Sequence, residues 1–175
     1  MKTIIAIDPG QEGAIAYQIT HDERFGKPET WNETGVIEMP ATITDLKDDL
    51  AIMKCQEYSV AYLEDVNVMP GQGSVSSGKF MRHVGHLEAM LIALNYKVVY
   101  VKPQVWQKHF SLLTKKTASG VKESKDQHKM RIVEFSQERF PDIKWTNTTD
   151  KDTKKRKKAI ADALAILEYA KEKEK

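Results

Sequence analysis

The sequence predicts an α/β fold in which helices flank one mixed sheet, a three-stranded antiparallel meander extended by parallel strands. Short apolar runs separated by turns fill the N-terminal quarter, and the later apolar runs alternate with stretches of helical period. No internal repeat, low-complexity segment or linker divides the chain. We therefore expect residues 1–175 to form one domain.

The N-terminal part is expected to form the meander. Residues 3–7 are a β-branched apolar run typical of a buried strand, and residues 8–13 form a turn. Residues 14–19 then return as a second strand. A polar loop over residues 21–32 leads to a third strand at residues 34–39.

Helices and strands alternate in the middle of the chain, which predicts parallel strands reached by helical crossovers. Thr42 or Thr44 can cap the first helix. The elements expected here are that helix up to about residue 56, a strand over 59–66, a loop over 69–78, a helix over 79–94 and a strand over 97–101.

The C-terminal part is expected to be helical. Pro103 opens a short helix in which Trp106 and Phe110 pack into the core. A basic, polar loop over residues 114–124 follows. The last two helices are predicted at residues 126–140 and 154–172.

The composition describes an ordinary globular protein, with 41% hydrophobic and 30% charged residues and a net charge of +2. The single cysteine, Cys55, cannot form an intramolecular disulfide, which suits a reducing cytosol. The apolar run after Met1 ends too early for a signal peptide, and no stretch has the length of a membrane span. We expect a soluble, cytoplasmic protein without a membrane partner.

Three carboxylates lie where the pattern is otherwise apolar. Asp8 ends the first predicted strand and Glu64 stands near the end of the fourth, and strand ends are where sites form in α/β sheets. Asp162 is the only polar residue between Ala159 and Leu167, so its helix segment has little exposed face. Buried carboxylates need a partner, and a cluster of three would raise the pKa of each.

A divalent cation relieves such repulsion, and Mg²⁺ suits a site with few carboxylates that takes its remaining ligands from water and phosphate. Each residue also has a simpler interpretation. Asp8 before Pro-Gly is a common turn residue, and Glu64 can be a strand-end residue paired with a lysine. Its neighbour Asp65 is either the true ligand or a solvated residue. Asp162 can cap a neighbouring backbone. The joint occurrence of the three favours the metal site.

The ordered set of these segments resembles the RuvC-type Holliday-junction resolvases, especially their phage-encoded relatives. Any one segment is weak evidence, but together they span most of the chain. The segments that carry the resemblance are IIAIDPG at 4–10, YLEDV at 62–66, GHLEAMLIALNYKVVYV at 85–101, KPQVW at 102–106, SKDQ at 124–127 and ADALAI at 161–166.

The resemblance implies an RNase H-like fold, a homodimer and a partner that is branched DNA, the four-way junction, cut by paired phosphodiester hydrolysis. It implies that Asp8, Glu64 and Asp162 are catalytic and bind two Mg²⁺ or Mn²⁺ ions. Those ions activate a water and stabilise the leaving oxygen.

One position departs from the family pattern. The family usually has an Asp or His about one turn before the last Asp, where this chain has Ala159 and Lys158. Lys158 shares a helical face with Asp162, so we expect it to act in catalysis by contacting the scissile phosphate or the attacking water. Asp150 and Asp152 are possible substitutes for the missing fourth ligand, but their helical register is unfavourable. The site can therefore hold either one or two metal ions.

Two basic clusters are predicted to bind DNA phosphates, with affinity that falls steeply with salt. The run before Asp162 has the wrong sign for a helix N-terminus, which favours a binding role over a solvated face. The first cluster is Lys115, Lys116, Lys122, Lys125 and Lys129, and the second is Lys151, Lys154, Lys155, Arg156, Lys157 and Lys158.

The loop over residues 69–78 is expected to overhang the site, with Met69 or Phe80 as a wedge into the junction, although Phe80 also fits a core position. His83 and His86 are expected to be structural or exposed. The next helix carries an apolar stripe. We expect the stripe to pack into the core, and part of it is a candidate dimer surface. Its members are Met81, Val84, Leu87, Met90 and Leu91.

Three other functions remain open. Asp8, Gly10 and Gly13 also fit the phosphate loop of sugar-kinase and actin-like ATPases, although the chain is too short for two such domains. The second is an RNase H-fold nuclease for RNA–DNA hybrids or flaps. The third is a junction-binding protein that has lost catalysis.

Overall fold

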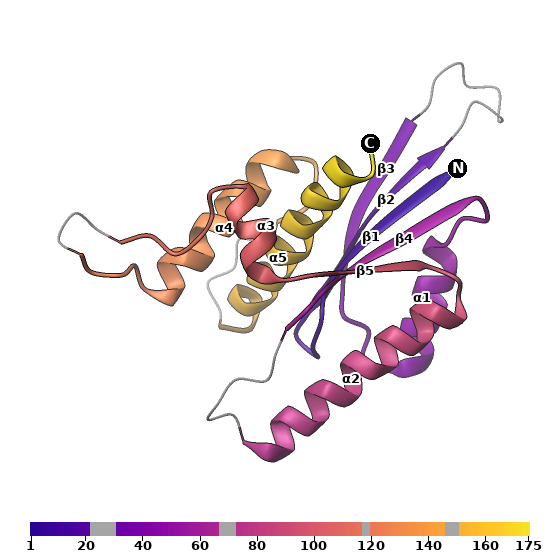
Figure 1. Ribbon diagram of the computed structural model, residues 1–175, viewed down its shortest axis with the longest axis horizontal. Helices are drawn as coiled ribbons and strands as arrows, with labels where there is room; N and C mark the ends of the chain where they lie inside the picture. Colours follow the sequence, from indigo (N-terminus) through magenta and orange to yellow (C-terminus); the bar gives the residue numbers. More distant parts are fainter. Residues whose placement is uncertain (22–30, 67–72, 117–119, 146–150) are drawn as a thin grey trace.

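The chain folds into three layers, with a five-stranded sheet between two groups of helices (Figure 1). This computed structural model describes residues 1–21, 31–66, 73–116, 120–145 and 151–175, without the side chains of 151–153. Helices α3, α4 and α5 lie on one side of the sheet and α1 and α2 on the other. The elements are β1 (Lys2–Asp8), β2 (Ala14–His21), β3 (Trp31–Glu38), α1 (Ile43–Met53), β4 (Tyr58–Glu64), α2 (Ser74–Ala93), β5 (Lys97–Val101), α3 (Pro103–His109), α4 (Lys125–Arg139) and α5 (Lys151–Lys173).

The strand order is β3-β2-β1-β4-β5. The β1–β2 and β2–β3 pairs are antiparallel, whereas β4 pairs parallel with β1 and with β5. The predicted meander with a parallel extension is therefore confirmed. Helix α1 begins after Thr42, whose side chain accepts a hydrogen bond from the backbone N–H of Asp45, so Thr42 rather than Thr44 is the cap.

Alternation along the strands divides the core into two clusters. Ile4 and Ala6 of β1 belong to the cluster beneath α5, whereas Ile5 and Ile7 belong to the cluster beneath α1 and α2. Helix α5 is fully buried where it crosses the sheet, because Ala161 and residues 163–167 have no exposed area. The apolar segment around Asp162 is therefore core, as its sequence predicts.

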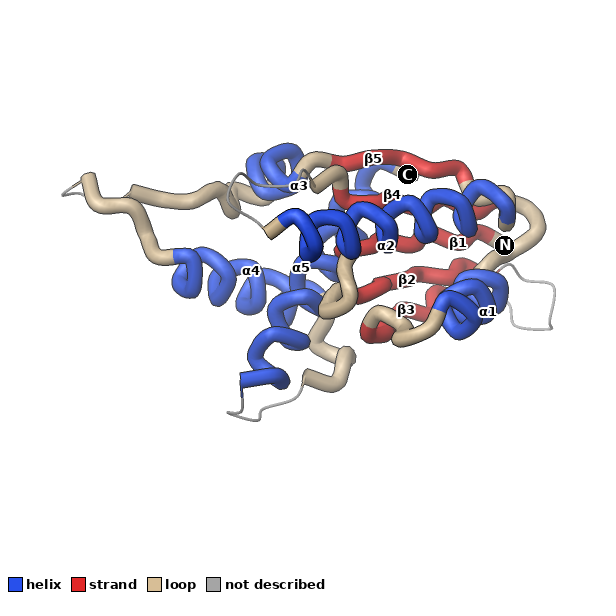
Figure 2. Tube along the Cα trace, turned by 90° about the horizontal axis from the view of Figure 1, so that it is seen from below, coloured by secondary structure: helices blue, strands red, loops and turns tan. Residues whose placement is uncertain are grey.

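The largest boundary error concerns the start of α2, whereas the first helix ends about three residues earlier than expected, at Met53. Residues 74–78, predicted to belong to a loop, form the first turns of α2, which begins after Gly73. Backbone hydrogen bonding overrides the weak propensity of this Ser- and Gly-containing segment, as in the bond from the Ser77 N–H to the Gly73 carbonyl. Seen from below, α2 runs along the face of the sheet (Figure 2).

No helix among the described residues is both long and apolar enough to cross a membrane.

Candidate active site

Asp8 and Glu64 stand side by side at the ends of adjacent parallel strands. Asp8 is the last residue of β1 and Glu64 the last of β4, and the preceding residues, Ile7 and Leu63, are register partners. Asp8 shares the strand face of Ile4 and Ala6, and Glu64 that of Val60 and Tyr62, all of which lie beneath α5. Both carboxylates are therefore directed toward the α5 side of the sheet.

Asp162 reaches the same region from α5. It is only 5% exposed, and the residues on either side of it are fully buried. Burial raises its pKa above the ordinary value. The structure thus brings together the three carboxylates that the sequence singled out, and we call Asp8, Glu64 and Asp162 the acidic site.

The three carboxylates influence one another. Burial, the charge of Asp162 and that of Glu64 together raise the pKa of Asp8 well above its usual range. Burial raises the pKa of Glu64 to about 7, and the charge of Asp162 adds to this shift. Perturbed carboxyl groups of this kind are typical of functional sites. The three carboxylates of the acidic site therefore repel one another, and a bound cation is one way to relieve such repulsion.

Trp106 of α3 holds Glu64 in place. Its ring N–H donates a hydrogen bond to Oε1 of Glu64 over 2.9 Å, and the side chain is fully buried. This bond stabilises the charged form and opposes the rise in the pKa of Glu64. Trp106 is the core residue that the sequence predicts, but its bond to Glu64 has no sequence signal, because it joins α3 to β4 through tertiary packing.

Lys129 of α4 lies within the acidic site. Its ammonium group forms a hydrogen-bonded ion pair with Oδ2 of Asp162. Although burial lowers the pKa of Lys129, the charges of Asp162, Asp8 and Glu64 raise it above the ordinary value overall. The sequence placed Lys129 among exposed phosphate contacts, and only the packing of α4 against α5 reveals its position.

Asp162 keeps one acceptor free. Its Oδ1 atom is buried and has no hydrogen-bond partner, which is costly for a carboxylate. Three carboxylates with an unsatisfied oxygen fit a hard divalent cation such as Mg²⁺. Within the described ranges, no three acidic, histidine or cysteine side chains already form a metal-binding group. The donor chemistry fits the ion, and Lys129 occupies part of its surroundings.

The turn after β1 borders the acidic site and requires glycine. A Cβ atom on Gly13 would lie 2.1 Å from the carbonyl oxygen of Asp8, and Gly10 has a φ of 124°. Phe80 of α2 lies against Gly10, half-buried, so it packs on the turn instead of standing free as a wedge. A groove passes this turn, lined by Asp8, Pro9, Gly10, Gln11, Glu12, Gly13, Ser76, Lys79, Phe80 and His83.

Lys158 is paired with another helix. Its Nζ donates to Oδ1 of Asp126 in α4 over 2.7 Å, and this contact lowers the pKa of Asp126. Two further residues of the same basic run contact the β1–β2 turn and the end of β3. Lys155 pairs with Glu12 at 3.0 Å and Arg156 with Glu38 at 3.4 Å. Lys154 is exposed and Lys157 partly exposed on the same turns of α5.

The predicted Met69 wedge and Asp150 lie outside the described residues, and the side chain of Asp152 is likewise not described.

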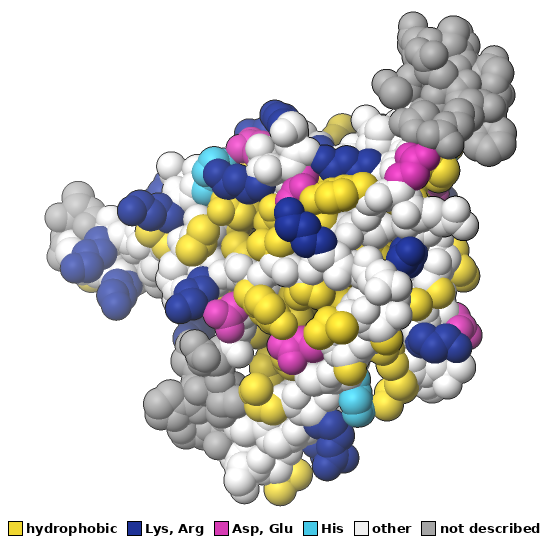
Figure 3. All heavy atoms as spheres, turned by 45° about the vertical axis from the view of Figure 1, so that its right-hand side comes forward, with side chains coloured by type: hydrophobic (Ala, Val, Ile, Leu, Met, Phe, Trp, Pro, Cys, Tyr) yellow, Lys and Arg dark blue, Asp and Glu magenta, His cyan; other side chains and the backbone are white. Residues whose placement is uncertain are grey.

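Most of the first basic cluster lies on a projection that we call the arm, residues 112–124. Residues 117–119 of the arm are not described. The backbones of Lys116 and Lys122 pair across the arm in an isolated antiparallel β-bridge, and the exposed Lys115 is next to them. The arm extends away from the body in Figures 1 and 2, and Figure 3 shows Lys and Arg side chains along it. Lys125 is exposed at the first position of α4.

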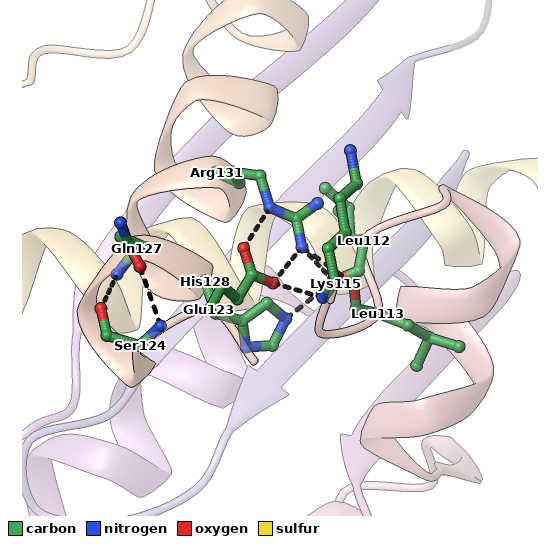
Figure 4. Close-up of polar contacts among 8 residues, drawn as sticks. All are labelled: Leu112, Leu113, Lys115, Glu123, Ser124, Gln127, His128 and Arg131. Atoms are coloured by element: carbon green, nitrogen blue, oxygen red, sulfur yellow. Dashed lines mark hydrogen bonds and ion pairs between the residues drawn. The ribbon is translucent and has the colours of Figure 1, made fainter. Parts of the chain in front are cut away.

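Polar contacts fix the base of the arm (Figure 4). Arg131 of α4 donates from Nε and Nη2 to the carboxylate of Glu123 over 3.0 and 2.5 Å, and also to the Leu113 carbonyl. The hydrogen bond from Arg131 lowers the pKa of Glu123 to about 2. Ser124 and Gln127 form a capping box that starts α4 at the same point. The base of the arm is therefore tied to the helix that carries Lys129.

Comparisons with protein family models and with curated protein sequences gave no match. Solved structures are similar over the full length. RuvC of T. thermophilus in complex with a Holliday junction substrate has a TM-score of 0.51 at 10% identity, covering 97% of this chain and 96% of that one. The fowlpox virus Holliday junction resolvase has a TM-score of 0.50 at 13% identity, covering 99% of each chain. The chain therefore has the RNase H-like fold of RuvC-type resolvases, as the resemblance implied.

Proposed function

We propose that this protein is a divalent-metal-dependent endonuclease that resolves four-way DNA junctions by paired phosphodiester hydrolysis. The observation that carries the proposal is the convergence of Asp8, Glu64 and Asp162 on one face of the sheet, each with a raised pKa. The likeness in fold to two Holliday junction resolvases supports the junction as substrate.

The three carboxylates would hold Mg²⁺ or Mn²⁺, which supplies an activated water and charge stabilisation when bound. Within the protein, Trp106 fixes the orientation of Glu64, and burial keeps bulk water away from Asp162. The groove beside Asp8, with Ser76 and Lys79 on α2, offers a path for the strand that is cut. Hydrolysis would add water across one P–O bond of that strand.

The basic surfaces would hold the rest of the junction. Lys115, Lys116 and Lys122 on the arm, with Lys125 at its base, are exposed and free to approach phosphates. The run from Lys154 to Lys157 lies at the start of α5, close to the start of α4, where Lys158 pairs with Asp126. Contacts of this kind position a duplex without reading its sequence.

We also propose that the protein acts as a homodimer through α2. Met81 and Ile92 are 48% and 63% exposed, and they lie three helical turns apart on one side of the helix. Gly78 and Gly85 are on the same side, and a Cβ atom on either would contact nothing. Leu87 and Leu91 of the predicted stripe are instead buried in the core. The exposed strip suits close approach of a second α2, which would place two acidic sites for paired cuts.

The ion pair between Lys129 and Asp162 favours a second candidate, a junction-binding protein without cleavage. One experiment separates the candidates. Synthetic four-way junction, linear duplex and RNA–DNA hybrid are incubated with the protein and Mg²⁺, and Asp8→Asn is the control.

We expect paired cuts in the junction and intact duplex, with binding but no cutting by Asp8→Asn. Degraded hybrid beside uncut junction would contradict the junction substrate, and tight binding without any cleavage would establish the second candidate. A fully active Asp8→Asn protein would contradict the acidic site, and measurable ATP affinity would favour the ATPase-like alternative.

A further inference from the structure

Lys129 is held beside the acidic site by the packing of α4 on α5. The Ser136 hydroxyl of α4 donates to the Ala161 carbonyl of α5 over 2.8 Å, immediately before Asp162 in the chain. Ser136 is fully buried and lies about two helical turns beyond Lys129. The backbone that carries the ammonium group is thus fixed relative to Asp162. The contact between the two side chains is a property of the fold and not of a mobile surface lysine.

This ion pair differs from the two lysine pairs at the start of α5. Lys155 and Lys158 meet carboxylates whose side chains are 70% and 85% exposed, where an ion pair contributes little. The side chain of Asp162 is only 7% exposed, and its second oxygen has no partner. A purely structural salt bridge in such a place would satisfy both oxygens. One oxygen is neutralised by lysine and the other is left available.

The charge balance indicates what this arrangement does. Three ionised carboxylates carry three negative charges, Lys129 offsets one, and a single divalent ion offsets the other two. A fourth acidic or His ligand is missing at Ala159 and Lys158, and Lys158 is engaged with Asp126. The chain therefore carries one negative charge fewer, and one tethered positive charge more, than a site with four acidic ligands.

We propose that Lys129 is the tethered counter-cation of the acidic site: it competes with a divalent ion for the carboxylates and replaces a second ion in balancing their charge. This inference rests on the proposed metal-dependent function. It assigns Lys129 a role in the site that the other basic residues of the first cluster do not share.

The direct test is the affinity of the DNA-free protein for Mn²⁺, measured by titration calorimetry. Lys129→Met removes the competing charge while keeping the aliphatic chain, so we expect Mn²⁺ to bind about tenfold more tightly or better. Lys129→Arg keeps the charge and is expected to retain weak binding. Lys125→Met, one turn earlier on the same helix, is the matched control and should change the affinity less than twofold.

An unchanged or weaker Mn²⁺ affinity in folded Lys129→Met would overturn the proposal, because a merely structural lysine would not oppose the ion. Equal tightening in Lys125→Met would also overturn it, since the effect would then be general surface charge. If wild type binds Mn²⁺ and Lys129→Met does not differ, the counter-cation role fails while the metal site stands. If no variant binds Mn²⁺, the metal site fails with it.

A second measurement uses the wild-type protein and does not depend on any variant folding. Lysines are labelled with an acylating reagent and quantified by mass spectrometry, with and without saturating Mg²⁺. Displacement of the Lys129 ammonium group from Asp162 by the ion should increase its labelling several-fold, with Lys125 unchanged, because an ammonium group paired with a carboxylate is held in its unreactive protonated form. Labelling of Lys129 that stays constant or falls on adding Mg²⁺ would contradict competition.

Discussion

The acidic site and the arm differ in how the chain builds them. The carboxylates of the acidic site come from β1, β4 and α5 and meet through sheet register and helix packing, with Glu64 and Asp162 buried and Asp8 half-buried. The lysines of the arm come from one continuous segment and remain exposed, and the base of the arm is held to α4 by Arg131, which contacts Glu123 and the Leu113 carbonyl. The proposed chemistry therefore depends on tertiary convergence, whereas the proposed DNA contacts of the arm depend on local sequence.

Substitutions in the two regions are therefore expected to have different effects. A change in the acidic site alters the reaction and the electrostatic strain of the core, while leaving the exposed binding surface in place. A change on the arm alters affinity and its dependence on salt, while leaving the carboxylates as they are. The two regions meet in α4, which carries Arg131 at the base of the arm and Lys129 in the acidic site.

The largest effect is expected from Asp162→Asn. Loss of one carboxylate charge from the site should reduce the cleavage rate at saturating junction at least about a thousandfold, because the proposed metal ion would lose a ligand. The dissociation constant for the junction should change less than threefold. Single-turnover cleavage and gel-shift titration measure the two quantities. Asp142→Asn, an exposed carboxylate away from the site, is the control, and similar losses in both variants would contradict the assignment.

The arm is tested by replacing Lys115, Lys116 and Lys122 together with glutamine. Junction affinity at physiological salt should fall by about one to two orders of magnitude, and the slope of log affinity against log salt should decrease by up to about three. The cleavage rate at saturating junction should remain within a few-fold of wild type. The charge-matched control replaces Lys47, Lys144 and Lys175, which are exposed elsewhere. An equal loss in this control would show that only net charge matters.

A smaller effect is expected from Trp106→Phe. The substitution removes the hydrogen bond to Glu64 and leaves the ring volume largely filled, so stability should fall by about 1–2 kcal/mol. Cleavage should slow about tenfold because Glu64 loses its fixed orientation. The pKa of Glu64 should rise, since the lost bond lowers it in the wild type, and the pH–rate profile should shift upward. An unchanged profile would show that Trp106 serves packing alone.

The pH dependence of stability gives the smallest expected effect. All three carboxylates have folded-state pKa values above their ordinary ones, so the folded chain retains protons that the unfolded chain releases. The contribution of protonated Glu64 to the free energy of unfolding is therefore fully present below about pH 4.5. It is lost as the pH rises toward about 7. The melting temperature without metal should fall by several degrees between pH 5 and 8. Glu64→Gln should reduce this fall in melting temperature. An unchanged fall would show that Glu64 does not contribute to the repulsion among the carboxylates.

Much of the fold and the acidic site could be predicted from the sequence because both depend on local patterns. Strand alternation puts Asp8 and Glu64 on the α5 face, and the uninterrupted apolar stretch around Asp162 marks a buried carboxylate. The start of α2 was missed because its first turn lacks an apolar pattern or a side-chain cap. The roles of Trp106 and Lys129 could not be predicted, since each depends on which atoms two separately packed elements bring together.

The predicted catalytic contact of Lys158 illustrates the same limit. Helical spacing correctly places Lys158 on the face of Asp162, but spacing within one helix says nothing of the neighbouring helix. Asp126 of α4 offers a partner at 2.7 Å, and Lys129 of the same helix is the lysine that contacts Asp162. The assignment of Lys158 to the reaction thus stays a prediction, and that of Lys129 now has a contact to support it.

The most direct test of the acidic site is the effect of Mg²⁺ on the melting temperature of wild type and Asp162→Asn at pH 8, without DNA. A cation that relieves repulsion among buried carboxylates should stabilise the folded wild type by several degrees. Asp162→Asn should melt higher than wild type without Mg²⁺ and gain little from it. Equal stabilisation of the two proteins by Mg²⁺, or none of the wild type, would contradict a metal site built from Asp8, Glu64 and Asp162.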